Sequence, residues 1–162
     1  MARITPDGYT KIHFLPTVTV PAAPTMAQFA AGTELTPFLT PAGLDTPETS
    51  TDADTSSIAS PRDFSVPATI GGDITGEFYR DDGSGTDDAW DALPRLQQGF
   101  LVISRFGGTG TDNAIVATNV VEVWEVRVSE RSNARLTRGE ALRFTSKFAL
   151  AADPIFNAVA TA

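Results

Sequence analysis

The clearest pattern of hydrophobic and polar positions lies in residues 72–107, which predict a strand, an acidic turn, a short helix and a second strand. In the first strand, Ile74, Gly76 and Phe78 fall on one side, which is the period of two of a strand with one buried face. Residues 100–103 are all apolar, as in a strand that is buried on both faces. We expect this unit to organise the rest of the chain.

The helix between these two strands is predicted for residues 86–93. Thr86 is a good N-cap, and the acidic residues that follow it suit the positive end of the helix dipole. Pro94 ends the helix after about two turns. Because so short a helix is unstable alone, it must be anchored on the sheet, and Trp90 and Leu93, three positions apart, are the expected anchors.

Four elements are predicted before this unit. Residues 1–7 read as an N-terminal arm that ends in a turn, and residues 8–20 alternate as a strand. Residues 21–32 predict a small helix whose capping box begins at Thr25. Residues 34–43 predict a strand, and the prolines within it indicate a sheet edge or a bulge.

Residues 43–70 form the least ordinary segment, because they are rich in Ser, Thr, Asp and Pro and contain few large apolar side chains. A structureless loop of this length is rare in a compact domain. The segment is therefore either a disordered linker or a loop that orders against something else, and Ile58, Phe64 and Val66 offer apolar contacts.

The C-terminal half predicts two strong strands. In residues 120–130 the alternation changes phase at Val123 and Trp124, which indicates a β-bulge. Residues 140–150 alternate cleanly, and residues 153–162 follow as a C-terminal strand or arm.

This order of elements favours a mainly β fold, an antiparallel β-sandwich or rolled sheet with a short flanking helix, over βαβ units. With 162 residues and 41% hydrophobic content, the chain fits a single domain over residues 1–162. The absence of cysteine excludes disulfides and thiolate metal sites. No apolar run approaches the roughly 20 residues of a membrane span, and the N-terminus lacks an apolar signal core.

The net charge of −8 argues against a general nucleic-acid binder, which neutralises phosphates with Lys and Arg. The charge is uneven: residues 1–94 carry 14 acidic and 4 basic side chains, and residues 95–162 carry 6 acidic and 8 basic ones. The two halves are therefore either ordinary solvated faces or surfaces that complement each other between copies. The basic residues concentrate at Arg127, Arg131, Arg135, Arg138, Arg143 and Lys147.

Signals of catalysis are nearly absent. His13 is the only histidine, and the sequence contains no Gly-x-Ser-x-Gly elbow, dinucleotide fingerprint or phosphate-binding loop. The acidic clusters at 52–54 and 81–88 do not have the spacing of an EF-hand, and a turn with an N-cap explains the second cluster. We therefore expect no enzyme, no metal and no cofactor.

Several stretches together resemble one known family. They are ARITPDGYTKIHFLP, AAGTELTPFLTPAGLDTP, FYRDDGSGTDDAWDALP, GFLVISRFGG, VEVWEVRVSER and LRFTSKFAL. They are similar to the major tail tube proteins of long-tailed, siphovirus-type bacteriophages, especially those that infect actinobacteria. The similarity covers most of the chain and contains no catalytic signature.

The resemblance implies a structural virion protein, assembled in the host cytoplasm, that forms six-membered rings. The rings stack into a tube, and sheets of neighbouring subunits join in a barrel around a lumen through which DNA passes without specific binding. The expected partners are other copies and tail proteins such as the tape measure, terminator and distal tail proteins, with no membrane. The long loop at about 43–70 would contact the adjacent ring, and the arms at 1–7 and about 153–162 would help.

Three sets of residues follow for such an assembly. The loop contacts would be Asp45, Glu48, Asp52, Asp54, Ile58 and Phe64, and the acidic ones would dock near the basic stretch of another copy. An acidic lumen wall would repel DNA at short range, and its candidates are Glu77, Glu122 and Glu125. The alternatives are a capsid decoration or cell-surface binding module and a small hydrolase.

Overall fold

The structure of the chain is a computed structural model that describes residues 8–54, 65–81 and 86–162. The predicted arm at 1–7 lies outside these residues, as do Ile58 and Phe64. In chain order the elements are β1 (Lys11–Leu15), α1 (Met26–Ala31), β2 (Thr33–Glu34), the 3₁₀ turn η1 (Thr36–Phe38), β3 (Leu39–Asp45), β4 (Thr49–Asp54), β5 (Ser65–Gly71), β6 (Asp73–Tyr79), α2 (Asp88–Ala92), β7 (Gln98–Ser104), the 3₁₀ turn η2 (Thr111–Asn113), β8 (Val120–Asn133), β9 (Arg143–Leu150) and β10 (Ile155–Val159).

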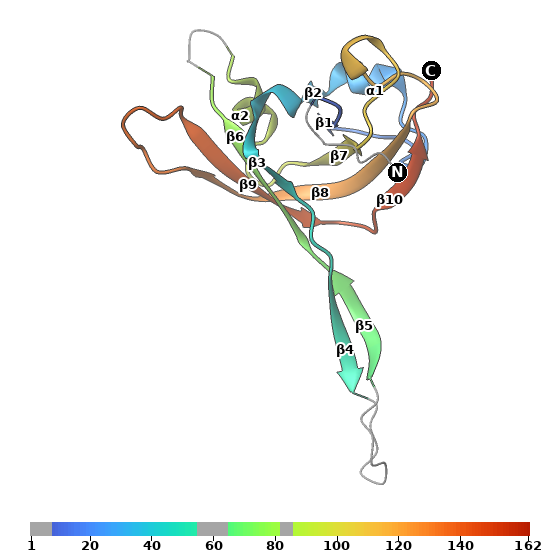
Figure 1. Ribbon diagram of the computed structural model, residues 1–162. Coiled ribbons are helices and arrows are strands. Elements are labelled where there is room, and N and C mark those ends of the chain that lie inside the picture. The colour runs from blue at the N-terminus through green and yellow to red at the C-terminus, as the bar shows by residue number, and fades with distance from the viewer. Residues whose placement is uncertain (1–7, 55–64, 82–85) are drawn as a thin grey trace, which may run out of the picture.

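One antiparallel sheet of eight strands dominates the fold and curves strongly (Figure 1). Its order is β2-β1-β7-β8-β9-β6-β3, and β10 pairs with the free end of β8 beyond β9. The prediction of a mainly β, antiparallel fold is confirmed, in its rolled-sheet form. The predicted C-terminal strand or arm at 153–162 contains β10, and Ala158 in it is fully buried.

The sheet has a hydrophobic core on each of its two faces. Leu101, Ile103 and Trp124 belong to the first core, whereas Val102 and Val123 belong to the second. The predicted bulge at Val123 and Trp124 is therefore wrong: these neighbours point to opposite faces, and β8 pairs with β7 across them without interruption. The apolar run in β7 is buried from both sides, as the sequence predicts.

The short helix α2 covers the first core. Leu93 and Ala89 are fully buried there, and Trp90 packs edge-on against Phe144 with ring centroids 5.0 Å apart. The guanidinium of Arg80 lies 4.0 Å from the centroid of the Trp90 ring, and that of Arg131 lies 3.7 Å from it. Cation–π contacts thus hold the exposed side of the helix while Leu93 and Ala89 hold its buried side.

The predicted N-cap at Thr86 is one residue too early, because the helix begins at Asp88 and its N-cap is Asp87. The Asp87 side chain makes no capping hydrogen bond. Its carboxylate instead accepts a hydrogen bond from Arg80 Nε at 2.7 Å, so an ion pair to the residue that follows β6 replaces the cap.

The helix α1 covers the second core, and its predicted capping box is present at Thr25. Its buried residue, Phe29, packs edge-to-face against His13 with ring centroids 5.3 Å apart. The strand before it is shorter than predicted, because β1 ends at Leu15 and does not continue to Val20. The chain must leave the sheet there to form the helix that covers it.

Residues 34–43 also differ in detail from a single strand. They contain the end of β2, the turn η1 and the start of β3. β3 is the edge of the sheet, and its register against β6 shifts between Leu39 and Leu44, so the predicted edge and bulge are both present.

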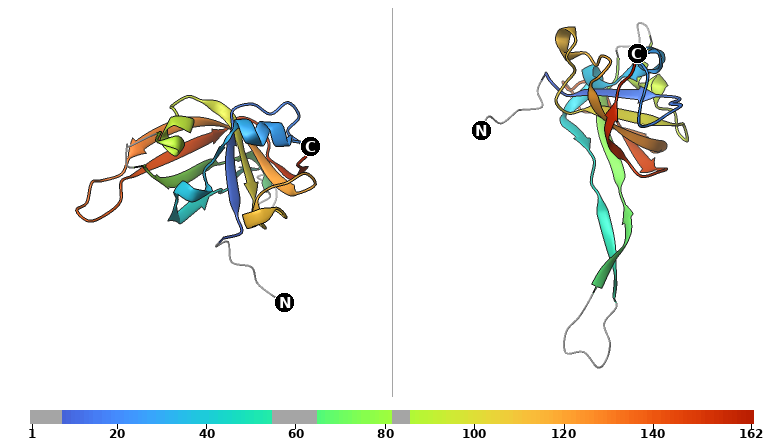
Figure 2. Two further views of the ribbon diagram at one scale, coloured as in Figure 1. Left: turned by 90° about the horizontal axis from the view of Figure 1, so that it is seen from above. Right: turned by 90° about the vertical axis from the view of Figure 1, so that its right-hand side faces the viewer.

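Within the segment at 43–70, for which the sequence leaves open a disordered linker or a loop that orders against something else, β4 and β5 form an antiparallel hairpin of their own. The hairpin stands well away from the rolled sheet (Figures 1 and 2). Its strands contain Thr49, Thr51, Thr69 and Ile70, and β-branched residues favour extended backbone. The low content of large apolar residues concealed this propensity.

The root of the hairpin is a close crossing of two backbone segments at Gly72. A Cβ atom added to Gly72 would lie 2.1 Å from the carbonyl oxygen of Pro47, whereas one added to the neighbouring Gly71 would meet nothing within 4 Å. Only glycine therefore fits at position 72.

We predict that Gly72→Ala destabilises the protein by about 1–3 kcal/mol, the usual cost of forcing an extra carbon into a filled site. Gly71→Ala is the matched control and should have little effect. Urea unfolding measures the difference, and digestion by trypsin at Arg62 should become faster in Gly72→Ala only. Equal behaviour of the two variants would contradict the crossing.

His13 gives a second prediction. Burial lowers the pKa of His13, and Glu34 opposes this shift while Lys11 adds to it. In the described part of the chain its buried Nδ1 has no hydrogen-bond partner. Because the unfolded histidine takes up a proton near pH 6.5 and the folded one only at lower pH, stability should fall as the pH drops below about 6.5.

The slope from one such group is at most about 1.4 kcal/mol per pH unit. His13→Gln should remove this component of the slope between pH 7.5 and 5, whereas Lys11→Gln should largely keep it. Urea unfolding at several pH values is the measurement, and an unchanged slope in His13→Gln would show that another group is responsible.

Candidate assembly surfaces

The sheet face opposite α2, called the outer face below, is polar over β6, β9 and β8. Strand register places alternate residues of these three strands on this face. They are Asp73, Thr75, Glu77, Tyr79, Glu125, Arg127, Glu130, Ser132, Arg143, Thr145, Lys147 and Ala149. Neither helix lies against this part of the sheet in the two views from the side and from above (Figures 1 and 2).

Ion pairs neutralise much of the charge on the outer face. An Arg143 guanidinium nitrogen lies 3.5 Å from Glu77 and another lies 2.6 Å from Glu140. Lys147 pairs with Glu130 at 3.2 Å. Glu125, in contrast, makes no ion pair with any residue that the structure describes.

The three predicted lumen acids do not share one surface. Glu77 and Glu125 lie on the outer face, but Glu122 lies on the opposite face with Trp124. Arg105 holds Glu122 there through hydrogen bonds of 2.5 and 2.9 Å, and Trp124 Nε1 donates a longer one at 3.4 Å. The structure therefore separates Glu122 from the other two.

The six predicted docking residues are similarly dispersed. Arg131 lies on the α2 side, where it stacks on Trp90 and donates to the Trp90 carbonyl at 2.7 Å. Arg135 and Arg138 are exposed in the loop between β8 and β9, away from the outer face of the strands. The basic stretch of the sequence thus becomes three separate groups, because strand alternation and the loop turn its members in different directions.

The acidic residues of the hairpin are only partly placed. Asp45 and Glu48 are exposed near its root. Asp52 and Asp54 lie on β4, and the structure gives only their place on that strand.

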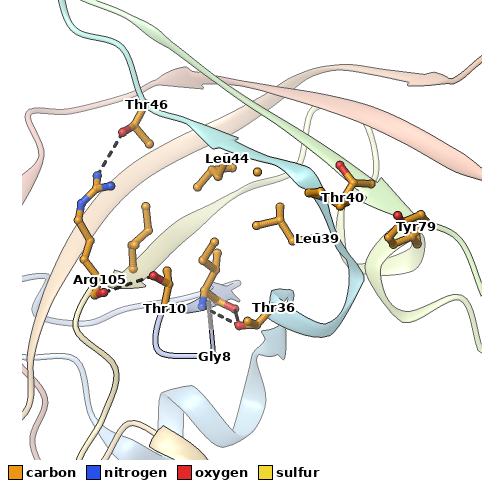
Figure 3. Close-up of a pocket in the computed structure, with 13 residues that line it drawn as sticks. Gly8, Thr10, Thr36, Leu39, Thr40, Leu44, Thr46, Tyr79 and Arg105 are labelled. Atoms are coloured by element: carbon orange, nitrogen blue, oxygen red, sulfur yellow. Dashed lines mark hydrogen bonds between the residues drawn. The ribbon is translucent and has the colours of Figure 1, made fainter. Parts of the chain in front are cut away.

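A cavity of about 650 Å³ lies between the two ends of the rolled sheet (Figure 3). Ile12 and Ile103 line it from β1 and β7, and Leu39 and Leu44 line it from β3. Arg105 crosses its rim by donating a hydrogen bond to Thr46 Oγ1 at 3.2 Å. Among the described residues that line it there is no carboxylate, histidine or cysteine. We call this cavity the open seam, because it lies where the two edges of the rolled sheet approach each other without pairing.

Exposed apolar side chains at the two ends of the sheet are a feature that the sequence analysis missed. They are Leu136 and Leu142 around the β8–β9 loop, and Val120, Phe156 and Val159 on β8 and β10. Two features of the sequence could have predicted these exposed side chains. One is the leucine within the polar stretch RSNARLTRG, and the other is a pair of consecutive apolar residues in a strand, where alternation turns one side chain away from the core.

Among the described residues, no group of His, Cys, Asp and Glu side chains is placed to hold a metal ion. The helices in that part of the chain are too short to cross a membrane.

Comparison with known proteins agrees with this architecture. A chain of the anti-feeding prophage (AFP) baseplate, solved by cryo-EM with 6-fold symmetrisation, is 10% identical and superposes with a TM-score of 0.53, covering 96% of this chain and 97% of that one. A chain from the tail of empty GTA particles, solved with helical refinement and C6 symmetry, is 12% identical with a TM-score of 0.56, covering 97% and 100%. At these identities the likeness concerns the fold.

A search of curated protein sequences gave no match. The sequence as a whole matches the family described as "Phage tail tube protein" over residues 1–162. The chain therefore belongs to the phage tail tube protein family.

Proposed function

We propose that this protein is the ring-forming subunit of a phage tail tube, and that six copies make each ring. The hairpin β4–β5 carries this proposal. An isolated two-stranded hairpin is at best marginally stable in water, and this one forms its own sheet away from both cores. A neighbouring copy would supply the surface that its own chain does not, and the six-fold symmetry of both similar assemblies supports a hexamer.

The open seam supports assembly through the sheet. The edge strands of the rolled sheet are β3 on one side and the two-residue strand β2 on the other. The cavity lies between these edges, so they do not pair with each other. Exposed edges recruit other strands unless they are covered. We propose that neighbouring subunits join their sheets into one barrel, which removes the edges.

The outer face is the proposed lumen wall, since it is polar and lacks a helix above it. Glu77 and Glu125 would then line the lumen, whereas Glu122 would not. The same face carries Arg127, Arg143 and Lys147, so its charges are close to balanced, and paired charges bind phosphate weakly. A wall of this kind lets DNA pass without specific binding and performs no catalysis.

The tube would be part of the virion, built in the host cytoplasm together with tape measure, terminator and distal tail proteins. Membership in the tail tube family supports the virion location, and the similarity to tail and baseplate assemblies supports other tail proteins as partners.

Removing the hairpin should separate ring formation from stacking. We replace residues 49–70 with a two-residue Asn-Gly turn, which suits a short β-hairpin. The variant should keep a folded, mainly β circular dichroism spectrum, because the hairpin stands away from the rolled sheet, and should form rings but no tubes in negative-stain images. The wild type at the same concentration is the control. Tubes formed by the variant would contradict the proposal, and a variant that unfolds would place the hairpin in the core.

The electrostatic contact between rings is a separate prediction. Asp45 and Glu48 are exposed, but among the described basic residues of the stretch only Arg127, Arg135 and Arg138 lack both a carboxylate and an aromatic partner. Raising NaCl from 0.05 to 1 M shortens the screening length to about 3 Å and should reduce the stacked fraction modestly, by less than about tenfold. Light scattering measures this, and assembly that is indifferent to salt would exclude the acidic-to-basic contact.

A further inference from the structure

We infer that adjacent subunits of the ring join end to end, so that the β8–β9 loop of one copy docks on an apolar patch at the opposite end of the next. The β8–β9 loop comprises residues 134–142, and the patch, called the β10 patch, comprises Val120, Phe156 and Val159. The inference rests on the proposed ring and assigns, beside the joined sheet edges, a second contact between neighbouring subunits.

The β8–β9 loop presents apolar side chains that its own chain does not cover. Leu136 is 79% exposed and Leu142 is 53% exposed, and polar residues surround them in the sequence. Two exposed leucines within one short loop form a natural apolar anchor for a neighbouring surface.

The β10 patch is an apolar surface of similar character. Val120 and Val159 are directly opposite each other on β8 and β10, and they are 58% and 41% exposed. Phe156 is 47% exposed and rests edge-on against Trp124, with ring centroids 5.5 Å apart. Single exposed apolar residues are ordinary, but a cross-strand pair together with an exposed aromatic residue on the same two strands indicates an interaction surface.

The two surfaces lie at opposite ends of the molecule. Figures 1 and 2 show the β8–β9 loop at one extremity of the sheet and β10 at the other, in the side view and in the view from above. The hairpin β4–β5 points in a third direction. A contact between two different patches is heterologous, and such contacts close into rings when the rotation between copies fits. Ring closure and stacking would then use separate surfaces.

Charge complements the apolar contact. Arg135 and Arg138 flank Leu136 and have no carboxylate partner among the described residues. Asp153 is exposed just before β10 and is likewise without an ion pair in that part of the chain. Attraction between the basic β8–β9 loop and the acidic side chain beside the β10 patch orients the two copies. It favours a contact between loop and patch over a contact between two loops, which would bring like charges together.

The absence of cysteine allows a direct test by disulfide cross-linking of the full chain. In the double variant Leu136→Cys/Phe156→Cys, mild oxidation should link successive copies into a ladder of bands on a non-reducing gel, ending at the closed ring. Leu136→Cys alone should give at most dimers. The matched control pairs Leu136→Cys with Leu96→Cys, because Leu96 is 56% exposed but lies outside the β10 patch, and should give no ladder.

A second pair of variants measures the contact without cross-linking. Val120→Asp should lower the fraction of rings more than about tenfold in sedimentation, since it places a charge in an apolar contact, whereas Leu96→Asp should not. Both substitutions are at exposed positions, so their melting temperatures should match the wild type and exclude unfolding.

The outcomes separate this inference from the proposed function. Tubes in negative stain without a ladder from Leu136→Cys/Phe156→Cys would overturn the end-to-end contact and leave the tube subunit intact. A ladder that stops at the dimer would indicate a symmetric contact and also overturn it. If neither rings nor tubes form at any concentration, the proposed function fails and the inference fails with it.

Discussion

The burial of one long strand from both sides is the constraint on which the rest of the structure depends. β8 sends Trp124, Val126 and Val128 into the core under α2 and sends Val121 and Val123 into the core under α1. An ordinary amphipathic strand supports one layer, so each face of β8 needs its own cover. The two short helices and the return of the chain to β10 are consequences of that need.

The same constraint explains why the outer face is polar only along part of the sheet. Where α1 covers β1, β7 and the start of β8, most buried residues on that side are apolar, and His13 packs there against Phe29. Beyond the reach of α1, the same side of β8 carries Glu125 and Arg127. A single strand thus changes from a core element to a polar wall within four residues, and no change of strand register accompanies it.

The sequence predicts elements well where one local pattern decides the outcome. Ile74 and Phe78 follow a single period, and Thr25 with Gln28 forms a local capping box, so both were read correctly. It fails at Val123 and Trp124, where a two-sided strand imitates a bulge, and at 43–70, where threonine-rich strands imitate a loop. Both errors come from treating burial in one core as the only reason for a strand to form.

The candidate surfaces were harder to predict because they depend on which residues meet across strands. Glu122 and Glu125 are close in sequence, but they face opposite sides, and Arg105, which follows β7, decides the environment of Glu122. Arg131 belongs to a basic stretch in the sequence, yet it stacks on Trp90 from α2. Charge counts describe neither arrangement, since both depend on contacts between distant parts of the chain.

The crossing at Gly72 has a mechanical consequence. The backbone at Gly72 lies too close to the Pro47 carbonyl to admit one more carbon atom. The direction in which the hairpin leaves the rolled sheet is therefore set by a backbone contact and not by a flexible linker. If such hairpins connected the rings of a tube, the tube would bend by a small tilt between each ring and the next. Its bending stiffness would then depend on the contact between Gly72 and Pro47 in every subunit.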